Sequence, residues 1–122
     1  MIVIYGLKNC DSCRKARALV TAAGAAHRFH DLRADGLPAG ALDRWLAAVG
    51  WEVLLNRRGT TWRALPEAEK AAVDAVAAAR LMARHPALIK RPVIEAGDVL
   101  IVGLAPQQQA ALEAAVAAQA RI

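Results

Sequence analysis

The sequence predicts an α/β fold with a mixed four-stranded sheet, in the order β-α-β, helical insertion, β-hairpin and closing helix. Three observations carry this prediction. A short apolar run at residues 2–5 leads through a loop into a helix, and a second strand pattern follows at 26–31. A stretch at about 40–88 has mostly helical spacing. Two apolar runs then flank Gly97-Asp98, a pair typical of hairpin turns, and precede an alanine-rich helix.

The first helix lies between the first two predicted strands. From about Asp11 to Ala23, apolar side chains recur at the i, i+3, i+4, i+7 spacing of one helix face. Asp11 or Ser12 can cap the start of this helix, and Gly24 can end it. A strand, a crossover helix and a strand in this length form a βαβ unit. We therefore expect the two strands to be parallel neighbours.

The insertion is predicted to consist of several helices. Residues 41–49 form the first, with apolar side chains on one face, and residues 51–55 add another turn or two. The stretch 56–63 is too polar for a core and too short for a long helix. Pro66 opens a further helical region that ends at His85. Its expected apolar stripe comprises Val73, Val76, Ala77 and Leu81.

The last part of the chain predicts a hairpin and a helix. Strands are expected at 92–95 and 99–103, and the closing helix at 107–120 after Pro106. The first and last helices can cover the faces of the sheet. This order is that of a thioredoxin-like fold with a helical insertion, so we expect a single domain over residues 1–122.

Composition and charge limit the classes of protein. The 122 residues are 57% hydrophobic and 4% aromatic, with a formal net charge of +5. No apolar run approaches the roughly 18 residues of a membrane span, and the N-terminus lacks the pattern of a signal peptide. The basic residues are scattered and not interleaved with aromatic ones, which does not favour a nucleic-acid partner. We expect a cytoplasmic protein whose thiols stay reduced unless they take part in chemistry.

The pair Cys10-x-x-Cys13 stands where the first loop meets the first helix. The start of a helix carries unpaired backbone N–H groups and the positive end of the helix dipole. Lys8, Arg14 and Lys15 add positive charge nearby. Each of these features favours the thiolate, which is the reactive form of cysteine. The sequence therefore predicts an activated nucleophile at Cys10.

Two other interpretations of the cysteines are weaker. The two cysteines could be buried apolar residues without a chemical role, but a strand–CxxC–helix arrangement favours redox chemistry. They could also bind zinc with His27 and His30, which follow in the second predicted strand. The spacing between these histidines is one residue short of the usual roughly three to five, and strand alternation sends them to opposite faces. The sequence therefore predicts no metal site.

Short motifs along nearly the whole chain carry a family resemblance. They are Ile4-Tyr5-Gly6, Asn9-Cys10, Arg14-Lys15-Ala16, Phe29-His30-Asp31, Asp35-Gly36-Leu37, Gly50-Trp51-Glu52, Leu54-Leu55-Asn56, Arg58-Gly59-Thr60-Thr61-Trp62-Arg63, His85-Pro86 and Ile89-Lys90-Arg91-Pro92. On these motifs the chain resembles the ArsC/Spx/YffB family of arsenate-reductase-like proteins, and most of all the YffB-type members. The resemblance implies a thioredoxin-like fold and an oxidoreductase with a redox-active cysteine.

The resemblance also implies roles for particular residues. Cys10 matches the catalytic cysteine, and Arg91 matches an arginine that contacts the oxyanion near it in the arsenate reductases. Pro92 matches the cis-proline that faces the active site in thioredoxin-like folds. Arg58 corresponds to a second anion-facing arginine, with the register around Arg57 and Arg58 left open. Among the cations close to Cys10 in sequence, Arg14 and Lys8 are expected to tune its thiolate and to help bind an anion or glutathione.

Two features depart from the patterns of the subfamilies. Arsenate reductases carry a third arginine late in the last hairpin, and the segment 101–106 contains none. One charge-assisted contact contributes about 1.5–3 kcal/mol, so its loss argues against true arsenate reduction. YffB-type proteins usually carry the first cysteine alone, whereas Spx-type regulators have the CxxC pair. Cys13 can therefore resolve a mixed disulfide on Cys10 or act as a redox switch.

The leading hypothesis is a glutathione-dependent thiol/disulfide reductase that uses the Cys10 thiolate on an oxidised thiol or oxyanion substrate. Arg91 and Arg58 would stabilise the thiolate and hold a carboxylate of glutathione, which acts as co-substrate without any bound cofactor. The alternatives are an arsenate reductase proper and an Spx-like redox-sensing regulator that binds RNA polymerase. None of these functions requires a membrane.

Overall fold

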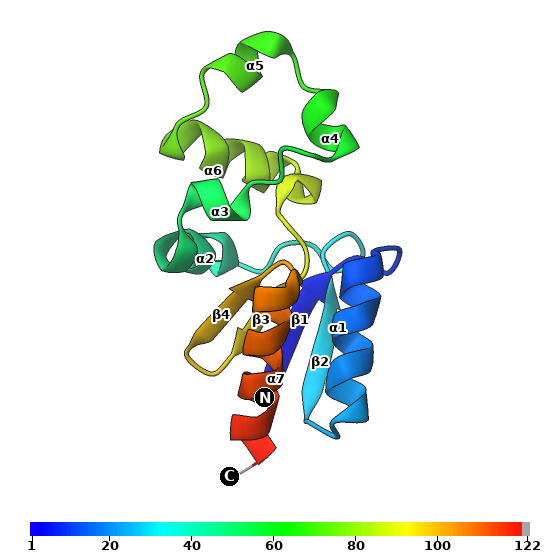
Figure 1. Cartoon of the computed structure of the whole chain (residues 1–122). Helices are drawn as coiled ribbons and strands as arrows, with labels where there is room; N and C mark the ends of the chain where they lie inside the picture. The colour runs from blue at the N-terminus through cyan, green and yellow to red at the C-terminus, as the bar shows by residue number, and fades with distance from the viewer. Residues whose placement is uncertain (121–122) are drawn as a thin grey trace. The chain divides into compact units, whose positions relative to one another are not determined.

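The computed structural model describes residues 1–120. Strands and helices alternate as β-α-β, then short helices, then a hairpin and a helix (Figure 1). The elements are β1 Ile2–Gly6, α1 Asp11–Ala22, β2 His27–Asp31, α2 Ala41–Val49, α3 Trp51–Leu54, α4 Thr60–Arg63, α5 Glu67–Ala71, α6 Ala75–Arg84, the 3-10 turn η1 Pro86–Leu88, β3 Val93–Ala96, β4 Val99–Val102 and α7 Pro106–Ala120.

The strands form one mixed four-stranded sheet, which confirms the predicted fold class. Their order is β2-β1-β3-β4. β1 pairs in parallel with β2, and the β1–β3 and β3–β4 pairs are antiparallel. Gly97 lies in the predicted turn between β3 and β4 and has a φ of +61°, a left-handed conformation that glycine adopts without steric cost.

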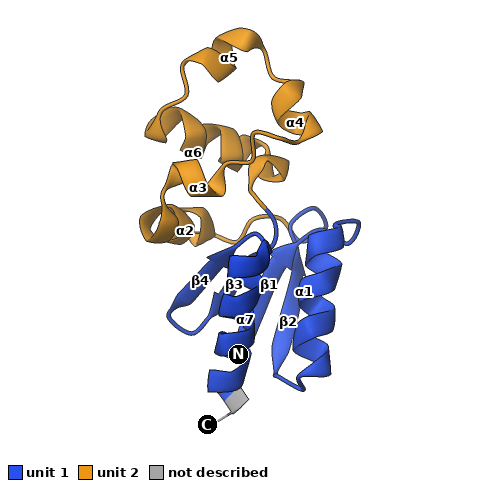
Figure 2. Cartoon of the chain, in the orientation of Figure 1, with its two compact units in different colours: residues 1–35, 91–122 blue, residues 36–90 orange. Residues whose placement is uncertain are grey.

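The chain divides into two compact units (Figure 2). The first unit contains residues 1–35 and the chain from residue 91 onward, and the second contains residues 36–90. The insertion predicted at about 40–88 falls inside the second unit. A single domain over residues 1–122 stays a prediction, and its last two residues lie outside the described part of the chain.

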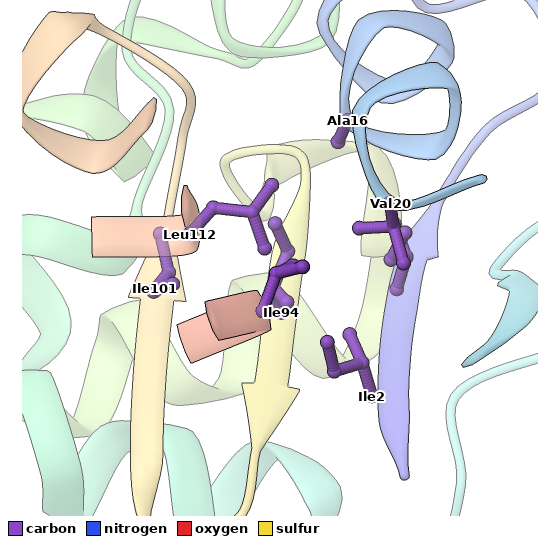
Figure 3. Packing of buried hydrophobic residues seen from close by; sticks show 8 residues of the cluster. Ile2, Ala16, Val20, Ile94, Ile101 and Leu112 are labelled. Atoms are coloured by element: carbon purple, nitrogen blue, oxygen red, sulfur yellow. The ribbon is translucent and has the colours of Figure 1, made fainter. Parts of the chain in front are cut away.

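The core of the first unit lies between the sheet and the helices α1 and α7. The side chains of this cluster converge on one face of the sheet (Figure 3). They are Ile2, Ile4, Ala16, Val20, Ile94, Ile101, Leu112 and Val116. Ile4 pairs with Ile94, and Ile94 pairs with Ile101, so three strands turn an isoleucine to this face at one level. The two helices therefore share one face, and the expectation that they would divide the faces of the sheet is wrong.

The second unit packs its helices around buried apolar residues. α2 buries Trp45 completely, and α6 buries Met82 completely. Two backbone hydrogen bonds join the chain after α3 to the chain after η1: the N–H of Asn56 donates to the Leu88 carbonyl at 2.7 Å, and the N–H of Lys90 donates to the Leu54 carbonyl at 2.8 Å. These bonds fix the ends of the segment that carries α4 to α6.

The helical region predicted from Pro66 to His85 is broken into α5 and α6, and its predicted apolar stripe is correct at Leu81 but wrong at Val76. Asp74 caps a new helix, because its Oδ1 accepts the N–H of Ala77 at 2.9 Å. The break changes the helical register, so Val76 is 66% exposed. The buried residues of α6 are Ala78, Leu81 and Met82. In the stretch 56–63, the last four residues form the short helix α4.

Among the helices in residues 1–120, none combines the length and the apolar character needed to cross a membrane.

Candidate active site

Cys10 is the N-cap of α1, which the sequence prediction assigned to Asp11 or Ser12. Its backbone is extended, with φ −102° and ψ 121°, and its Sγ accepts the N–H of Cys13 at 3.3 Å. The helix begins at Asp11, so the cysteine itself faces the free N–H groups of the first turn. Asp11 instead forms an ion pair with Arg14 on the exposed side of the helix.

This position suits a thiolate nucleophile. Cys10 is a free, half-exposed thiol at the positive end of a twelve-residue helix. Its sulphur accepts a backbone hydrogen bond that strengthens when the sulphur carries a negative charge. The arrangement stabilises the charged, reactive form and leaves it open to solvent.

Cys13 is buried beneath β1. Its side chain is 0% exposed. A Cβ placed on Gly6, the last residue of β1, would clash with the Cys13 Sγ, so the missing side chain of Gly6 makes room for this sulphur. Burial, and then the side-chain hydrogen bond to Cys10, raise the pKa of the Cys13 thiol to about 12. Cys13 is therefore a neutral thiol at physiological pH.

Arg91 and Pro92 lead into β3 in the same unit as the cysteines. The Arg91–Pro92 peptide bond is cis, which confirms the predicted isomer. The Pro92 carbonyl accepts the N–H of Gly103 at 2.8 Å. Arg91 is half-buried, and its positive charge acts to lower the pKa of the Cys13 thiol, although burial outweighs this effect. The charge of Arg91 thus reaches the cysteine pair.

The other two predicted cations of this unit are exposed. Lys8 lies in the turn before Cys10, and its charge helps to lower the pKa of Asp31, after the larger effect of a hydrogen bond from the Ala34 N–H. Arg14 lies in the first turns of α1 and already contacts the carboxylate of Asp11. Their predicted role in anion binding stays a prediction.

Asp31 is a buried carboxylate that the sequence prediction left without a role. It ends β2, and its Oδ1 accepts the N–H groups of Arg33 at 2.8 Å and of Ala34 at 3.1 Å. These bonds fix the turn that follows the strand. Because β1 and β2 are parallel, this turn and the loop that carries Cys10 leave the same end of the sheet. The signal available in the sequence was an Asp at the end of a predicted strand, where its side chain can accept the N–H groups of the turn that follows.

Arg58 lies in the second unit, where it lines a pocket of about 350 Å³ that we call the cationic pocket. Its walls comprise Glu52, Leu55, Asn56, Arg57, Arg58 and Lys90. The Asn56 Oδ1 accepts the N–H of Arg58 at 3.0 Å, which shapes the turn. Within residues 1–120, the side chains of Arg57, Arg58 and Lys90 form no ion pair with a carboxylate. Three positive charges therefore line one pocket beside a single carboxylate.

Arg57 is held between two indole rings. Its guanidinium carbon lies 5.2 Å from the ring centroid of Trp51 and 5.9 Å from that of Trp62. Such cation–π contacts orient the guanidinium without neutralising its charge. The sequence left the register around Arg57 and Arg58 open, and two tryptophans within six residues of Arg57 were a signal that this side chain is held in place.

The two histidines of the weaker zinc interpretation do not converge. His27 pairs with Ile2 in the sheet and His30 pairs with Tyr5, so the two histidines lie on opposite faces of β2, as strand alternation predicts. The His30 ring instead packs against the ring of Tyr5, with centroids 5.2 Å apart.

Known proteins resemble this chain along most of its length. The ArsC family model matches residues 5–112. An uncharacterized protein of Haemophilus influenzae is 41% identical over 103 residues, which cover 84% of this chain and 90% of the relative. The solved structure of a protein named YffB is 45% identical with a TM-score of 0.84, and the match covers 92% of this chain and 98% of YffB.

A solution structure of an arsenate reductase (ArsC) related protein from Brucella melitensis is 48% identical with a TM-score of 0.72, covering 90% of this chain and 92% of the relative. These matches confirm both the thioredoxin-like α/β fold and the family resemblance seen in the sequence motifs. The chain belongs to the ArsC family and is related to the arsenate reductases.

Proposed function

We propose that this protein is a glutathione-dependent thiol/disulfide reductase in which the Cys10 thiolate is the nucleophile. One observation carries the proposal: the Cys10 sulphur caps α1 and accepts the N–H of Cys13 at 3.3 Å, while its side chain remains partly open to solvent. A sulphur in this position gains stabilisation as a thiolate and can be reached by a substrate. Such a thiol is suited to a reducing compartment, in keeping with the expected cytoplasmic location.

The reaction consists of two thiol–disulfide exchanges. In the first, the Cys10 thiolate attacks the glutathione sulphur of a mixed disulfide R–S–S–G, which forms Cys10–S–S–G and releases R–S⁻. In the second, the thiolate of a free glutathione attacks the glutathione sulphur bound to Cys10. This step releases glutathione disulfide and regenerates the Cys10 thiolate. The net result is that one free glutathione reduces R–S–S–G to the thiol and is joined to the glutathione that R–S–S–G carried, as glutathione disulfide.

Anion binding supports glutathione as the co-substrate. Glutathione carries two carboxylates, and arginine binds a carboxylate through two parallel hydrogen bonds. Arg91 supplies positive charge to the cysteine pair, and Arg58 belongs to the cationic pocket of the second unit. We assign one glutathione carboxylate to Arg91, which belongs to the same unit as Cys10, and Arg58 stays a predicted anion-binding residue of the cationic pocket.

Arsenate reduction is the second candidate, because a relative that is 48% identical is named an arsenate reductase related protein. The absence of arginine in the segment 101–106 weighs against it. An Spx-like regulator is the third candidate, suggested by the CxxC pair.

The test compares the wild type, Cys10→Ser and Ser12→Ala. Reduction of a glutathione–cysteine mixed disulfide is followed by coupling glutathione disulfide formation to NADPH oxidation through glutathione reductase. We expect Cys10→Ser to abolish turnover, because a serine hydroxyl is not ionised at neutral pH. Ser12→Ala removes a hydroxyl from the same exposed turn of α1 and should keep full activity. Turnover by Cys10→Ser would refute the proposal.

Two further assays separate the alternatives. Arsenate-dependent oxidation of glutathione by the wild type, without activity on the mixed disulfide, would favour arsenate reduction. Co-purification with RNA polymerase by a protein that lacks both activities would favour the regulator.

A further inference from the structure

We propose that the cationic pocket of the second unit is a binding site for an α-amino acid head group, in which Arg57, Arg58 and Lys90 bind the carboxylate and Glu52 binds the ammonium. The chemistry that the pocket recognises is a zwitterion, carried by a free amino acid or by the γ-glutamyl end of glutathione. The inference concerns the second unit by itself and goes beyond the proposed function, because no step of the thiol chemistry depends on it.

The cationic pocket carries charges of both signs. Arg57, Arg58 and Lys90 line it together with the carboxylate of Glu52. Among residues 1–120, Glu52 forms no ion pair with any of these three cations, so the opposite charges share the pocket without neutralising one another. A simple anion in this pocket is attracted by three groups and repelled by the fourth, whereas a zwitterion can be attracted by all four. The charge pattern therefore favours a zwitterion.

The backbone around the pocket is fixed on two sides. Leu55 forms an isolated antiparallel bridge with Ile89, and the backbone hydrogen bonds of Asn56 and Lys90 flank this bridge. The bridge thus joins the segment that follows Glu52 to the segment that ends at Lys90. Leu55 is 3% exposed and gives the pocket an apolar wall. The backbone positions from which the two opposite charges project are therefore fixed relative to each other.

The two arginines are held by groups that leave their charges unneutralised. The guanidinium of Arg57 lies against the indole rings of Trp51 and Trp62. The backbone carbonyl of Arg58 accepts the guanidinium of Arg63 at 2.8 Å, which ties the turn from which Arg58 projects. Arginine binds a carboxylate through two parallel hydrogen bonds, and a group that is already positioned loses less freedom on binding. The arginine side of the pocket is therefore suited to a carboxylate.

The size of the pocket suits a small zwitterion. Its volume of about 350 Å³ lies at the lower end of the range for small-molecule sites, roughly 300–1,000 Å³. In an α-amino acid the carboxylate and the ammonium are attached to the same carbon. One ligand can therefore contact the arginines and Glu52 at the same time, with its methylene groups against Leu55.

The experiment compares L-glutamine with glutaramate, which is L-glutamine without the ammonium group. Each is titrated into the ¹⁵N-labelled wild type and into Glu52→Gln, and backbone amide shifts of residues 52–58 give the affinity. We expect Glu52→Gln to bind L-glutamine roughly fivefold more weakly, because one solvent-accessible ion pair is lost. The same variant should bind glutaramate more tightly, because a repelling carboxylate is gone. A site for simple anions cannot give these opposite changes.

Two further variants serve as controls. Glu67→Gln removes an exposed carboxylate of the same unit that does not line the pocket, and both affinities should equal those of the wild type. The titrations use about 0.15 M salt, where charges more than about 8 Å apart are largely screened. Arg58→Gln removes a cation from the pocket and should weaken both ligands. Tighter binding of both ligands by Glu52→Gln would overturn the proposal, as would unchanged affinities or no amide shifts with L-glutamine.

A third ligand identifies the source of the head group. S-methylglutathione carries the γ-glutamyl end but has no free thiol. If it binds the wild type more tightly than Glu52→Gln, the pocket accepts the γ-glutamyl end of glutathione. If L-glutamine alone shows that difference, the ligand is a free amino acid, and either result supports the proposal. These titrations involve no thiol exchange, so they can fail while the Cys10→Ser turnover test succeeds, and the reverse.

Discussion

Gly6 and Cys13 show how a single missing side chain shapes the active-site turn. Gly6 ends β1 and Cys13 lies in the first turn of α1, and the sulphur occupies the space beside the glycine Cα. The sulphur can therefore lie against the strand, in the space that a side chain on Gly6 would fill. The burial of the second cysteine thus depends on a residue that carries no functional group.

A side chain at Gly6 should push against Cys13. We expect Gly6→Ala to lower the free energy of unfolding by about 1–3 kcal/mol, the usual cost of overpacking. Urea denaturation measures this change. In the double variant Gly6→Ala/Cys13→Ala the clashing sulphur is gone, and the nearest atom to the new methyl carbon is the Cβ of residue 13, at 3.2 Å. The double variant should therefore lose less free energy of unfolding than the sum of the two single losses. Additive losses would show that the two residues do not interact.

At the scale of the element, capping side chains decide where the helices begin. Cys10 caps α1 and Asp74 caps α6, each by accepting an N–H from the residue three positions later. The Cys10 cap makes a reactive group part of the helix end. The Asp74 cap divides what the sequence pattern suggested was a continuous helical region.

Removal of the Asp74 cap should weaken α6. We expect Asp74→Ala to lower the free energy of unfolding by about 1 kcal/mol, because the N–H of Ala77 loses its acceptor. Asp74→Asn keeps an oxygen in the capping position and should behave almost as the wild type. Chemical denaturation of the three proteins measures the difference. Equal stability of Asp74→Ala and the wild type would mean that the cap contributes nothing.

At the scale of the whole molecule, the first unit joins the two ends of the chain. β1 lies between β2, which follows it closely in sequence, and β3, which follows only after residues 36–90. The core beneath the sheet likewise combines α1 with α7 (Figure 3). The loop that holds Cys10 therefore depends on packing by the last helix.

Leu112 tests this dependence. It is 0% exposed in α7, and we expect Leu112→Ala to cost about 2–5 kcal/mol of unfolding free energy through the cavity that it leaves. Hydrogen exchange of the β1 amides should become faster, because the strand packs on the same cluster. Glu113→Ala changes the exposed neighbour and should alter neither quantity. Unchanged exchange in β1 would show that α7 does not stabilise the sheet.

The sequence by itself determined the features that depend on neighbours along the chain. Apolar spacing located the strands and most helices, Gly97 marked the hairpin turn, and the position of Cys10 before a helix predicted a thiol at a helix end. Family motifs predicted the cis bond before Pro92. Each of these signals lies within a few residues, so local backbone preference and turn chemistry were enough to reveal it.

The tertiary structure decided what depends on residues that are distant in sequence. It placed α1 and α7 on one face of the sheet, because isoleucines of three strands turn to that face. It also buried Cys13 against Gly6, where burial raises the pKa of its thiol, whereas the sequence left open whether Cys13 resolves a mixed disulfide or acts as a redox switch. A CxxC motif fixes the spacing of two thiols, but the burial of each sulphur, and hence its protonation, depends on the strand packed above it.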